Sequence, residues 1–156
     1  AYDRAMELTN NQDPLVLREA GRSAFENGNF DKAAMLLQRA IAMNGDDLMA
    51  MFFYARLLSD YGDIDGAVYN FERILKALPE DPEVHFYYGR ALGENGRLFE
   101  AHLHLAYAGL YANKEKTLKR NIKQAQQYLK TDRHQELMDK LQEEYEERKE
   151  FWDDIL

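Results

Sequence analysis

Apolar and small residues recur along the first two thirds of the chain at a spacing of 34 residues. An alanine returns unchanged in this register, at Ala33, Ala67 and Ala101. A large apolar residue follows each alanine by four positions, at Leu37, Phe71 and Leu105. A small residue precedes each alanine by twelve positions, at Gly21, Ala55 and Gly89. Repetition at this length predicts tandem helical units, and small residues facing large ones predict close helix packing.

Two further residue types mark where the predicted helices begin and end. Aspartate recurs at Asp13, Asp47 and Asp81, and glycine recurs at Gly28, Gly62 and Gly96. An aspartate before a helix accepts hydrogen bonds from the free amides of the first turn, and Pro14 and Pro82 supply the φ that suits the first helical position. A glycine after a helix adopts the left-handed turn without steric cost. Each unit is therefore predicted to be a helix, a turn and a second helix.

The period ends after residue 112, where a different hairpin is predicted. Segment 98–112 is expected to be both the second helix of the third unit and the first helix of a fourth pair. A helix near 115–129 carries one apolar stripe, formed by Leu118, Ile122, Ala125 and Leu129. The last helix begins at Thr131 or Asp132 and repeats apolar residues every four positions, at Leu137, Leu141 and Tyr145. This helix is predicted to close the stack with a polar outer face.

These patterns divide the chain into a helical N-terminal flank (1–13), three units (14–47, 48–81 and 82–112), the second helix of a shared fourth hairpin (113–130) and an acidic C-terminal capping helix (131–156). A 34-residue helical hairpin with small, large and small residues at these places resembles the tetratricopeptide repeat (TPR) family over residues 14–112. The resemblance implies an all-α, right-handed superhelical solenoid of antiparallel helix hairpins with a concave groove. Met51, Ile74 and His85 depart from the family pattern, which loosens the expected packing but not the fold.

Composition and charge narrow the possible functions. The chain has 156 residues, 46% of them apolar, and a net charge of −8. This size favours one domain, and the negative charge disfavours binding to nucleic-acid phosphates. Since the sequence has no cysteine and no run of 18 apolar residues, we expect neither a Cys-ligated metal nor membrane insertion.

The charges are unevenly distributed over the last two helices. Residues 113–130 contain six bases and one acid, whereas residues 131–156 contain four bases and ten acids. We expect the two helices to face each other as a solvated ion-pair surface. The alternative is that the acidic helix binds a basic partner.

Known catalytic patterns are missing from the sequence. It has no HExxH, nucleophile elbow, Walker loop or GxGxxG. His102 and His104 are two positions apart on a predicted helix, so they point to different sides and cannot chelate one metal ion. His85 stands where the TPR family packs an aromatic residue. We therefore expect structural histidines, no metal, no cofactor and a non-catalytic protein.

The inner face of the first helices carries the candidate binding residues. Arginine recurs at Arg22, Arg56 and Arg90, and four positions earlier, on the same helix face, stand Arg18, Phe52 and Phe86. Tyr107 and Tyr111 extend this wall if the fourth pair stacks in line. We predict that these eight residues bind a protein or peptide, the arginines holding carboxylates or carbonyls and the aromatic rings holding apolar side chains. The alternative is that the arginines pair with the acids four positions later, Glu26, Asp60 and Glu94.

Two other functions stay open. The stretches YGRALGENGR (88–97) and EAHLHLAY (100–107) resemble the TPR tails of bacterial periplasmic zinc metalloproteases related to the beta-barrel assembly-enhancing protease. That resemblance implies an accessory docking domain in the periplasm with an HExxH domain before Ala1, and without it we expect a cytoplasmic protein. A self-assembling scaffold is the other alternative, because the apolar end formed by Phe151, Trp152, Ile155 and Leu156 could enter a neighbour's groove and form a homo-oligomer.

Overall fold

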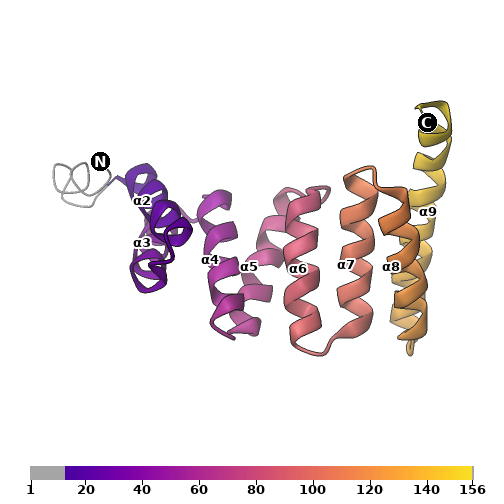
Figure 1. Ribbon diagram of the computed structural model, residues 1–156, viewed down its shortest axis with the longest axis horizontal. Coiled ribbons are helices and arrows are strands. Elements are labelled where there is room, and N and C mark those ends of the chain that lie inside the picture. Colours follow the sequence, from indigo (N-terminus) through magenta and orange to yellow (C-terminus); the bar gives the residue numbers. More distant parts are fainter. Residues whose placement is uncertain (1–12, 156) are drawn as a thin grey trace. The chain divides into compact units, whose positions relative to one another are not determined.

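The computed structural model describes residues 13–155, and all its regular elements in that range are α-helices (Figure 1). They are α2 (Pro14–Glu26), α3 (Phe30–Met43), α4 (Leu48–Asp60), α5 (Ile64–Ala77), α6 (Pro82–Glu94), α7 (Leu98–Tyr111), α8 (Glu115–Gln127) and α9 (Asp132–Ile155). Successive helices form antiparallel hairpins, which confirms the predicted fold class. The helical flank predicted over 1–13 lies almost wholly outside the described residues.

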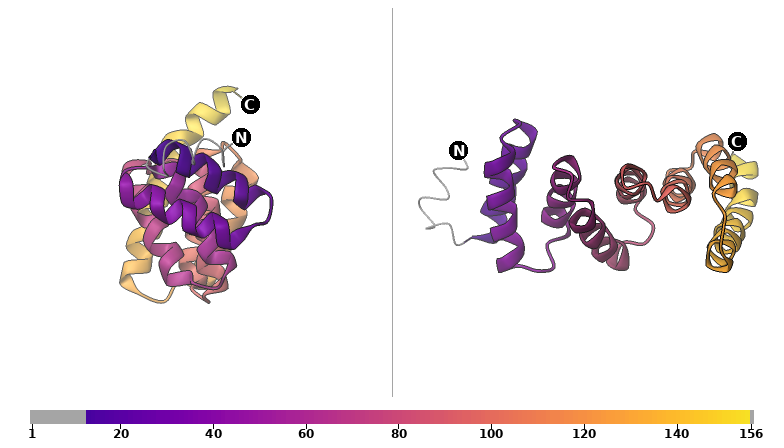
Figure 2. Two further views of the ribbon diagram at one scale, coloured as in Figure 1. Left: turned by 90° about the vertical axis from the view of Figure 1, so that its left-hand side faces the viewer. Right: turned by 90° about the horizontal axis from the view of Figure 1, so that it is seen from below.

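The helices fall into two compact units, which we describe separately. The N-terminal unit extends to Ala77 and contains α2 to α5, and the C-terminal unit begins at Leu78 and contains α6 to α9. Figure 2 shows the paired helices of each unit from two further sides. In the N-terminal unit α2 packs on α3 and α4 on α5, and in the C-terminal unit α7 packs on both α6 and α8.

The repeated aspartates and glycines define the helix ends. The side chains of Asp13, Asp47 and Asp81 accept hydrogen bonds from the backbone amides of Leu15 (2.9 Å), Ala50 (3.1 Å) and Glu83 (2.9 Å). Gly28, Gly62 and Gly96 have φ of 78°, 87° and 76°, in the left-handed region that favours glycine. The turn between α7 and α8 instead uses Asn113, whose φ is 58°. Asparagine tolerates this conformation better than most residues.

Small residues bring paired helices close together. A Cβ atom on Gly21 would lie 2.8 Å from the Leu37 side chain, and one on Gly89 would lie 2.9 Å from Leu105 Cγ. On α7, a Cβ atom on Gly109 would lie 2.7 Å from the backbone nitrogen of Leu118. The absence of a side chain at these positions therefore permits the close contacts of α2 with α3, α6 with α7, and α7 with α8.

The last helix is part of the core of the C-terminal unit. Met138, Leu141, Tyr145 and Trp152 of α9 are buried against apolar residues of α7 and α8. Trp152 is only 3% exposed, and its Nε1 donates to Asn113 Oδ1 at 3.0 Å. The expectation that Trp152 belongs to a free apolar end is therefore wrong, because its indole ring fills a site within its own unit. Phe151 beside it is 57% exposed.

His85 and His104 form a polar pair inside the C-terminal unit. His85 is 5% exposed, its Nδ1 lies 3.0 Å from His104 Nδ1, and its Nε2 lies 2.8 Å from the carbonyl oxygen of Pro79. Since a carbonyl only accepts, His85 Nε2 carries the proton and the Nδ1 atom of His104 donates to that of His85. Burial lowers the pKa of His85, and burial together with the neighbouring His85 lowers the pKa of His104 to about 3. Both rings are neutral at pH 7.

Candidate protein-binding site

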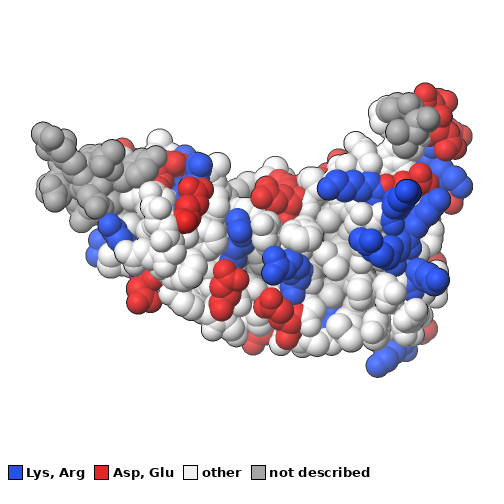
Figure 3. All heavy atoms as spheres, viewed as in Figure 1, with Lys and Arg blue, Asp and Glu red and all other residues white. Residues whose placement is uncertain are grey.

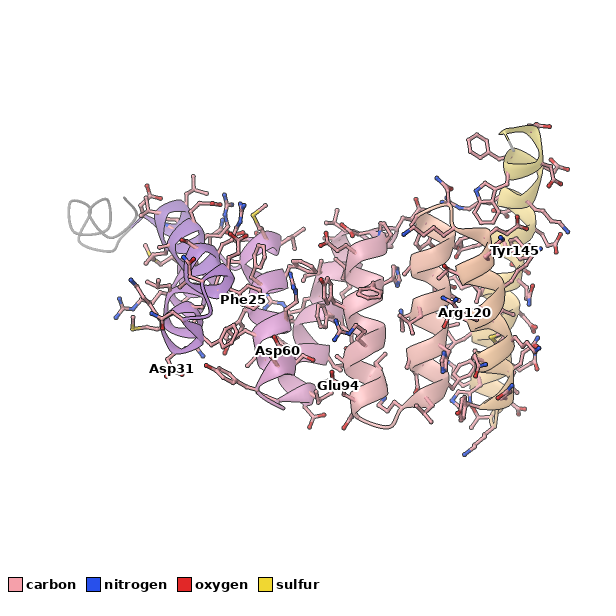
Figure 4. The ribbon with its side chains drawn as sticks, viewed as in Figure 1. Phe25, Asp31, Asp60, Glu94, Arg120 and Tyr145 are labelled. Atoms are coloured by element: carbon pink, nitrogen blue, oxygen red, sulfur yellow. The ribbon has the colours of Figure 1, made fainter. Side chains whose placement is uncertain are left out.

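In the N-terminal unit, Arg56 on α4 is surrounded by aromatic rings. The Arg56 Cζ lies 5.0 Å from the ring centroid of Phe25, 5.6 Å from that of Phe52 and 6.0 Å from that of Phe53. Phe25 reaches α4 from the end of α2 (Figure 4), where its ring lies 5.7 Å from that of Phe53. The predicted pair Phe52 and Arg56 is therefore brought together, within a larger cation–π cluster than the helix spacing indicated.

The two other predicted arginines of this unit contact carboxylates. Arg18 Nη1 lies 3.6 Å from Asp47 Oδ2, on the buried residue that caps α4. Asp47 Oδ2 accepts no hydrogen bond within the described chain, so the Arg18 charge compensates it. Arg22 Nε lies 3.1 Å from Glu26 Oε1, the self-pairing that the helix spacing allowed. Both arginines therefore stabilise their own unit.

In the C-terminal unit, Phe86 and Arg90 share one exposed face of α6. Phe86 is 42% exposed, and Arg90 Cζ lies 5.8 Å from its ring centroid and 6.0 Å from that of Tyr87. Within residues 13–155, Arg90 makes no ion pair, so the alternative pairing with Glu94 is not formed. Arg90 instead lies against the two rings.

The predicted tyrosines of α7 lie against α9 and His85. Tyr107 is 8% exposed, and its ring stacks on His85 at 5.3 Å and on Tyr111 at 5.6 Å. The Tyr111 hydroxyl donates to Glu144 Oε2 at 2.5 Å, and Arg148 Cζ lies 4.9 Å from the Tyr111 ring. Burial and the nearby Glu144 carboxylate raise the pKa of both hydroxyls. These two residues therefore anchor α9.

A groove of about 560 Å³ is lined by three helices of the C-terminal unit. Four residues of α7 and its C-cap contribute small or apolar surface to it, Leu105, Ala108, Gly109 and Ala112. Phe86 and Tyr87 line it from α6, and Thr117, Arg120 and Asn121 line it from α8. The volume is within the range of pockets that bind ligands in other proteins, and the mostly apolar lining with a few polar groups is typical of them.

Basic side chains gather on α8 beside this groove. Figure 3 shows Lys and Arg over α8, next to uncharged surface on α6 and α7. Arg120, labelled in Figure 4, and Lys114 both line the groove. In the part of the chain that the structure describes, the side chains of these two residues form no ion pair or hydrogen bond. Their charges are therefore available to a partner.

The expected ion-pair surface between α8 and α9 is not formed. Among the described residues no ion pair joins the two helices, and Lys119 of α8 pairs with Glu115 of its own helix at 3.3 Å. The contact uses the Tyr145 hydroxyl, which donates to Glu115 Oε1 at 2.6 Å, together with apolar packing. The side of α8 that meets α9 is therefore set by its apolar residues, whereas Lys116, Lys119 and Lys123 of α8 are exposed.

Sequence reasoning did not assign the groove residues of α8. The sequence shows that segment 113–130 is basic, but its charge pattern alone predicts a contact with α9 and not a groove. The sequence signal that could have identified them is their spacing. Arg120 and Asn121 follow Thr117 by three and four positions, so the three residues share one face beside the apolar stripe.

Within residues 13–155, no group of three His, Asp or Glu side chains could hold a metal ion. None of the helices in this range is long and apolar enough to span a bilayer.

Comparisons with known proteins define the class as a helical repeat protein. Two models described as tetratricopeptide repeat match residues 24–68 and 55–115. Similar solved structures include the TPR domain of Arabidopsis OM64, with a TM-score of 0.65 and 19% identity over 74% of this chain and 96% of that one. MamA has a TM-score of 0.69 and 12% identity over 96% of this chain and 88% of that one. MamA AMB-1 has a TM-score of 0.62 and 21% identity over 84% and 74% of the two chains.

The chain belongs to the tetratricopeptide repeat family. The two family matches together extend from residue 24 to residue 115, and the structural likeness, at these low identities, shows the same fold. A search of curated proteins found no match. TPR repeats form modules for protein–protein interaction, and that is the class of function assigned to this chain.

Proposed function

We propose that the chain binds a peptide segment of a protein partner in the groove of the C-terminal unit, with a second contact on the Arg56 cluster of the N-terminal unit. The observation that carries the proposal is a groove of about 560 Å³ with apolar surface on α6 and α7, at which Phe86 is 42% exposed. Exposed apolar surface beside charged residues is typical of partner sites. Arg90, four positions after Phe86 on α6, gives the same site a donor for carbonyl or carboxylate groups.

The proposed contact residues are a subset of those predicted from the sequence. Phe86 and Arg90 would contact the peptide at the groove, and Phe52 and Arg56 would contact a second segment. Arg18 and Arg22 are left out because carboxylates of their own unit occupy them. Tyr107 and Tyr111 are left out because α9 and His85 cover them.

A random 12-residue peptide library displayed on phage tests the proposal. Enriched peptides are synthesised with fluorescein, and their dissociation constants are measured by fluorescence anisotropy for the wild type and for Phe86→Ala. Burying a phenylalanine contributes about 1.5–3 kcal/mol, so the variant should bind at least about tenfold more weakly. Tyr69→Ala is the matched control, because Tyr69 on α5 is 61% exposed and does not line the groove.

Two results contradict this function. One is equal affinity of Phe86→Ala and the wild type for every enriched peptide. The other is a library from which no peptide is enriched above an unrelated control protein. Circular dichroism and urea unfolding verify that both variants fold, since a change at a half-exposed side chain should alter the free energy of unfolding by less than about 0.5 kcal/mol.

The protease-tail and scaffold hypotheses lead to different measurements. An HExxH domain encoded upstream of Ala1 would support the protease reading, and its absence there would remove it. For self-assembly, Phe151 is an exposed apolar residue near the end of α9. A mass by light scattering that falls to the monomer value in Phe151→Glu would favour the scaffold.

A further inference from the structure

We infer that Asn44, in the turn between α3 and α4, is a site of spontaneous covalent modification, at which the side-chain amide is lost and isoaspartate forms. This inference concerns the N-terminal unit and is independent of the proposed function. Glycine after an asparagine leaves the backbone nitrogen open to the preceding side chain, because it has no side chain of its own. The sequence contains three such pairs, Asn27-Gly28, Asn44-Gly45 and Asn95-Gly96. The structure makes the second pair different from the other two.

The reaction joins the nitrogen of Gly45 to the side-chain carbonyl carbon of Asn44. The nitrogen gives its proton to a base in the solvent and attacks Cγ, and the carboxamide nitrogen takes up a proton and leaves as ammonia. The product is a five-membered succinimide ring. Water then opens the ring, at Cγ to give aspartate or at the main-chain carbonyl carbon to give isoaspartate. Replacement of NH₂ by OH raises the mass by about 1 Da.

In the two pairs at the ends of α2 and α6, hydrogen bonds already hold the attacking nitrogen. The glycine nitrogen donates to a carbonyl oxygen of the preceding helix at 3.1 Å in each pair, and the next nitrogen along the chain donates at 2.8 and 3.0 Å. These four bonds are Gly28 N to Phe25 O, Asn29 N to Ala24 O, Gly96 N to Gly93 O and Arg97 N to Leu92 O. The peptide would have to rotate and break them before the nitrogen could reach the side chain.

The pair Asn44-Gly45 lies in an exposed turn and lacks this protection. Within residues 13–155, the Gly45 nitrogen donates no hydrogen bond. Asn44 Oδ1 accepts from the amide of Asp46 at 3.2 Å, so the carboxamide is directed toward the backbone that follows it. The turn is held instead through its carbonyl oxygens, by Asp47 N on Asn44 at 3.2 Å and by Arg73 Nη2 on Gly45 at 3.1 Å. The attacking nitrogen itself has no bond to break.

Modification at Asn44 would disturb the beginning of α4. Asp47, three positions later, is 6% exposed and caps α4 by accepting from the amide of Ala50 at 3.1 Å. Isoaspartate adds one CH₂ to the main chain just before this cap, and both products add a negative charge near a carboxylate that Arg18 already compensates. We therefore expect the N-terminal unit to lose stability as the modified form accumulates.

Tryptic peptide mapping compares the three pairs within one molecule. Trypsin releases each pair in a separate peptide, 23–32, 40–56 and 91–97. The folded protein is kept at 37 °C and pH 8, and mass spectrometry measures the modified fraction of each peptide over time. Asn44 should react at least about tenfold faster than Asn27 and Asn95, whereas in 6 M guanidinium chloride the three rates should agree within about threefold. Methylation by an isoaspartate methyltransferase with labelled S-adenosylmethionine identifies isoaspartate in peptide 40–56.

Gly45→Ala is the matched variant for this experiment. The nearest atom to an added Cβ would be 4.0 Å away, so the variant should fold, which circular dichroism verifies. Its side chain hinders ring closure, so the rate at Asn44 should fall at least about fivefold while those at Asn27 and Asn95 stay unchanged.

Three results would overturn the inference. Equal rates at the three asparagines in the folded protein would mean that the reaction follows global unfolding. A reaction at Asn44 that occurs in guanidinium chloride but not in the folded protein would mean that the turn protects it. An unchanged rate at Asn44 in Gly45→Ala would mean that the Gly45 nitrogen is not the attacking group.

Discussion

The neutral pair of His85 and His104 predicts that the protein loses stability between pH 7 and pH 5. Burial is the main cause that lowers both pKa values, that of His104 from 6.5 to about 3. A histidine with a lowered pKa binds its proton more readily in the unfolded chain. The stability that the neutral, buried histidine contributes is therefore fully present above pH 6.5, and it is lost as the pH falls from 6.5 toward 3.

The size of the effect follows from proton linkage. Once the pH is below 6.5, one proton excluded from the folded protein reduces the free energy of unfolding by about 1.4 kcal/mol per pH unit. Between pH 7 and pH 5 this amounts to about 2 kcal/mol for His104 alone. At His85, the hydrogen bond to the Pro79 carbonyl and the Asp81 and Glu144 carboxylates oppose the lowering of the pKa by burial, so the effect there should be smaller.

Urea unfolding followed by circular dichroism at pH 7, 6 and 5 measures this loss. His104→Asn keeps an amide donor near His85 Nδ1, but its side chain binds no proton. Between pH 7 and pH 5 the free energy of unfolding of this variant should therefore fall less than that of the wild type, by a difference of about 2 kcal/mol. His102→Asn changes a histidine two positions away and leaves the pair intact, so it should follow the wild type. Parallel loss of stability in His104→Asn and the wild type would refute the reasoning.

Two further predictions concern packing in the C-terminal unit, each measured by urea unfolding at pH 7. Gly89→Ala should lower the free energy of unfolding by about 1–3 kcal/mol, because the added Cβ would lie 3.0 Å from the backbone oxygen of Ala101. Gly93→Ala should raise it by up to about 1 kcal/mol, because the nearest atom to its Cβ would be 3.7 Å away. Equal effects of the two substitutions would contradict the described packing of α6 on α7. Trp152→Ala should cost about 3–5 kcal/mol, while Phe151→Ala, at an exposed position, should change stability by less than about 0.5 kcal/mol. A small effect of Trp152→Ala would show that α9 does not depend on the indole.

Sequence reasoning predicted the hairpins well because each marker has one local physical cause. Asp81 is followed by a helix because its carboxylate accepts two amide hydrogen bonds of the first turn, at 2.9 and 3.2 Å. Gly96 ends the same helix at a positive φ, which costs a glycine nothing. Interactions within a few residues decide such features, so they can be inferred before any tertiary contact is known.

The candidate site was harder to predict because helix spacing shows which residues share a face but not what covers that face. Tyr107 and Tyr111 are four positions apart, as are Phe86 and Arg90, yet α9 covers the tyrosines and leaves Phe86 exposed. Arg18 and Arg22 share a face too, and they contact carboxylates on different helices. The difference depends on where α9 and the cap of α4 lie, which are long-range contacts.

The groove forms because one face of α7 contacts both α6 and α8. Leu105 contacts α6 at Gly89, and Gly109, one turn later on the same stripe, contacts α8 at Leu118. Because α6 and α8 both approach this stripe, the surface left open beside their contacts belongs to α7 and its C-cap. Ala108 and Ala112, which line the groove with Gly109, are small, so this surface is a depression and not a filled seam. The residues that allow α7 to belong to two hairpins are thus also those that form the floor of the proposed peptide site.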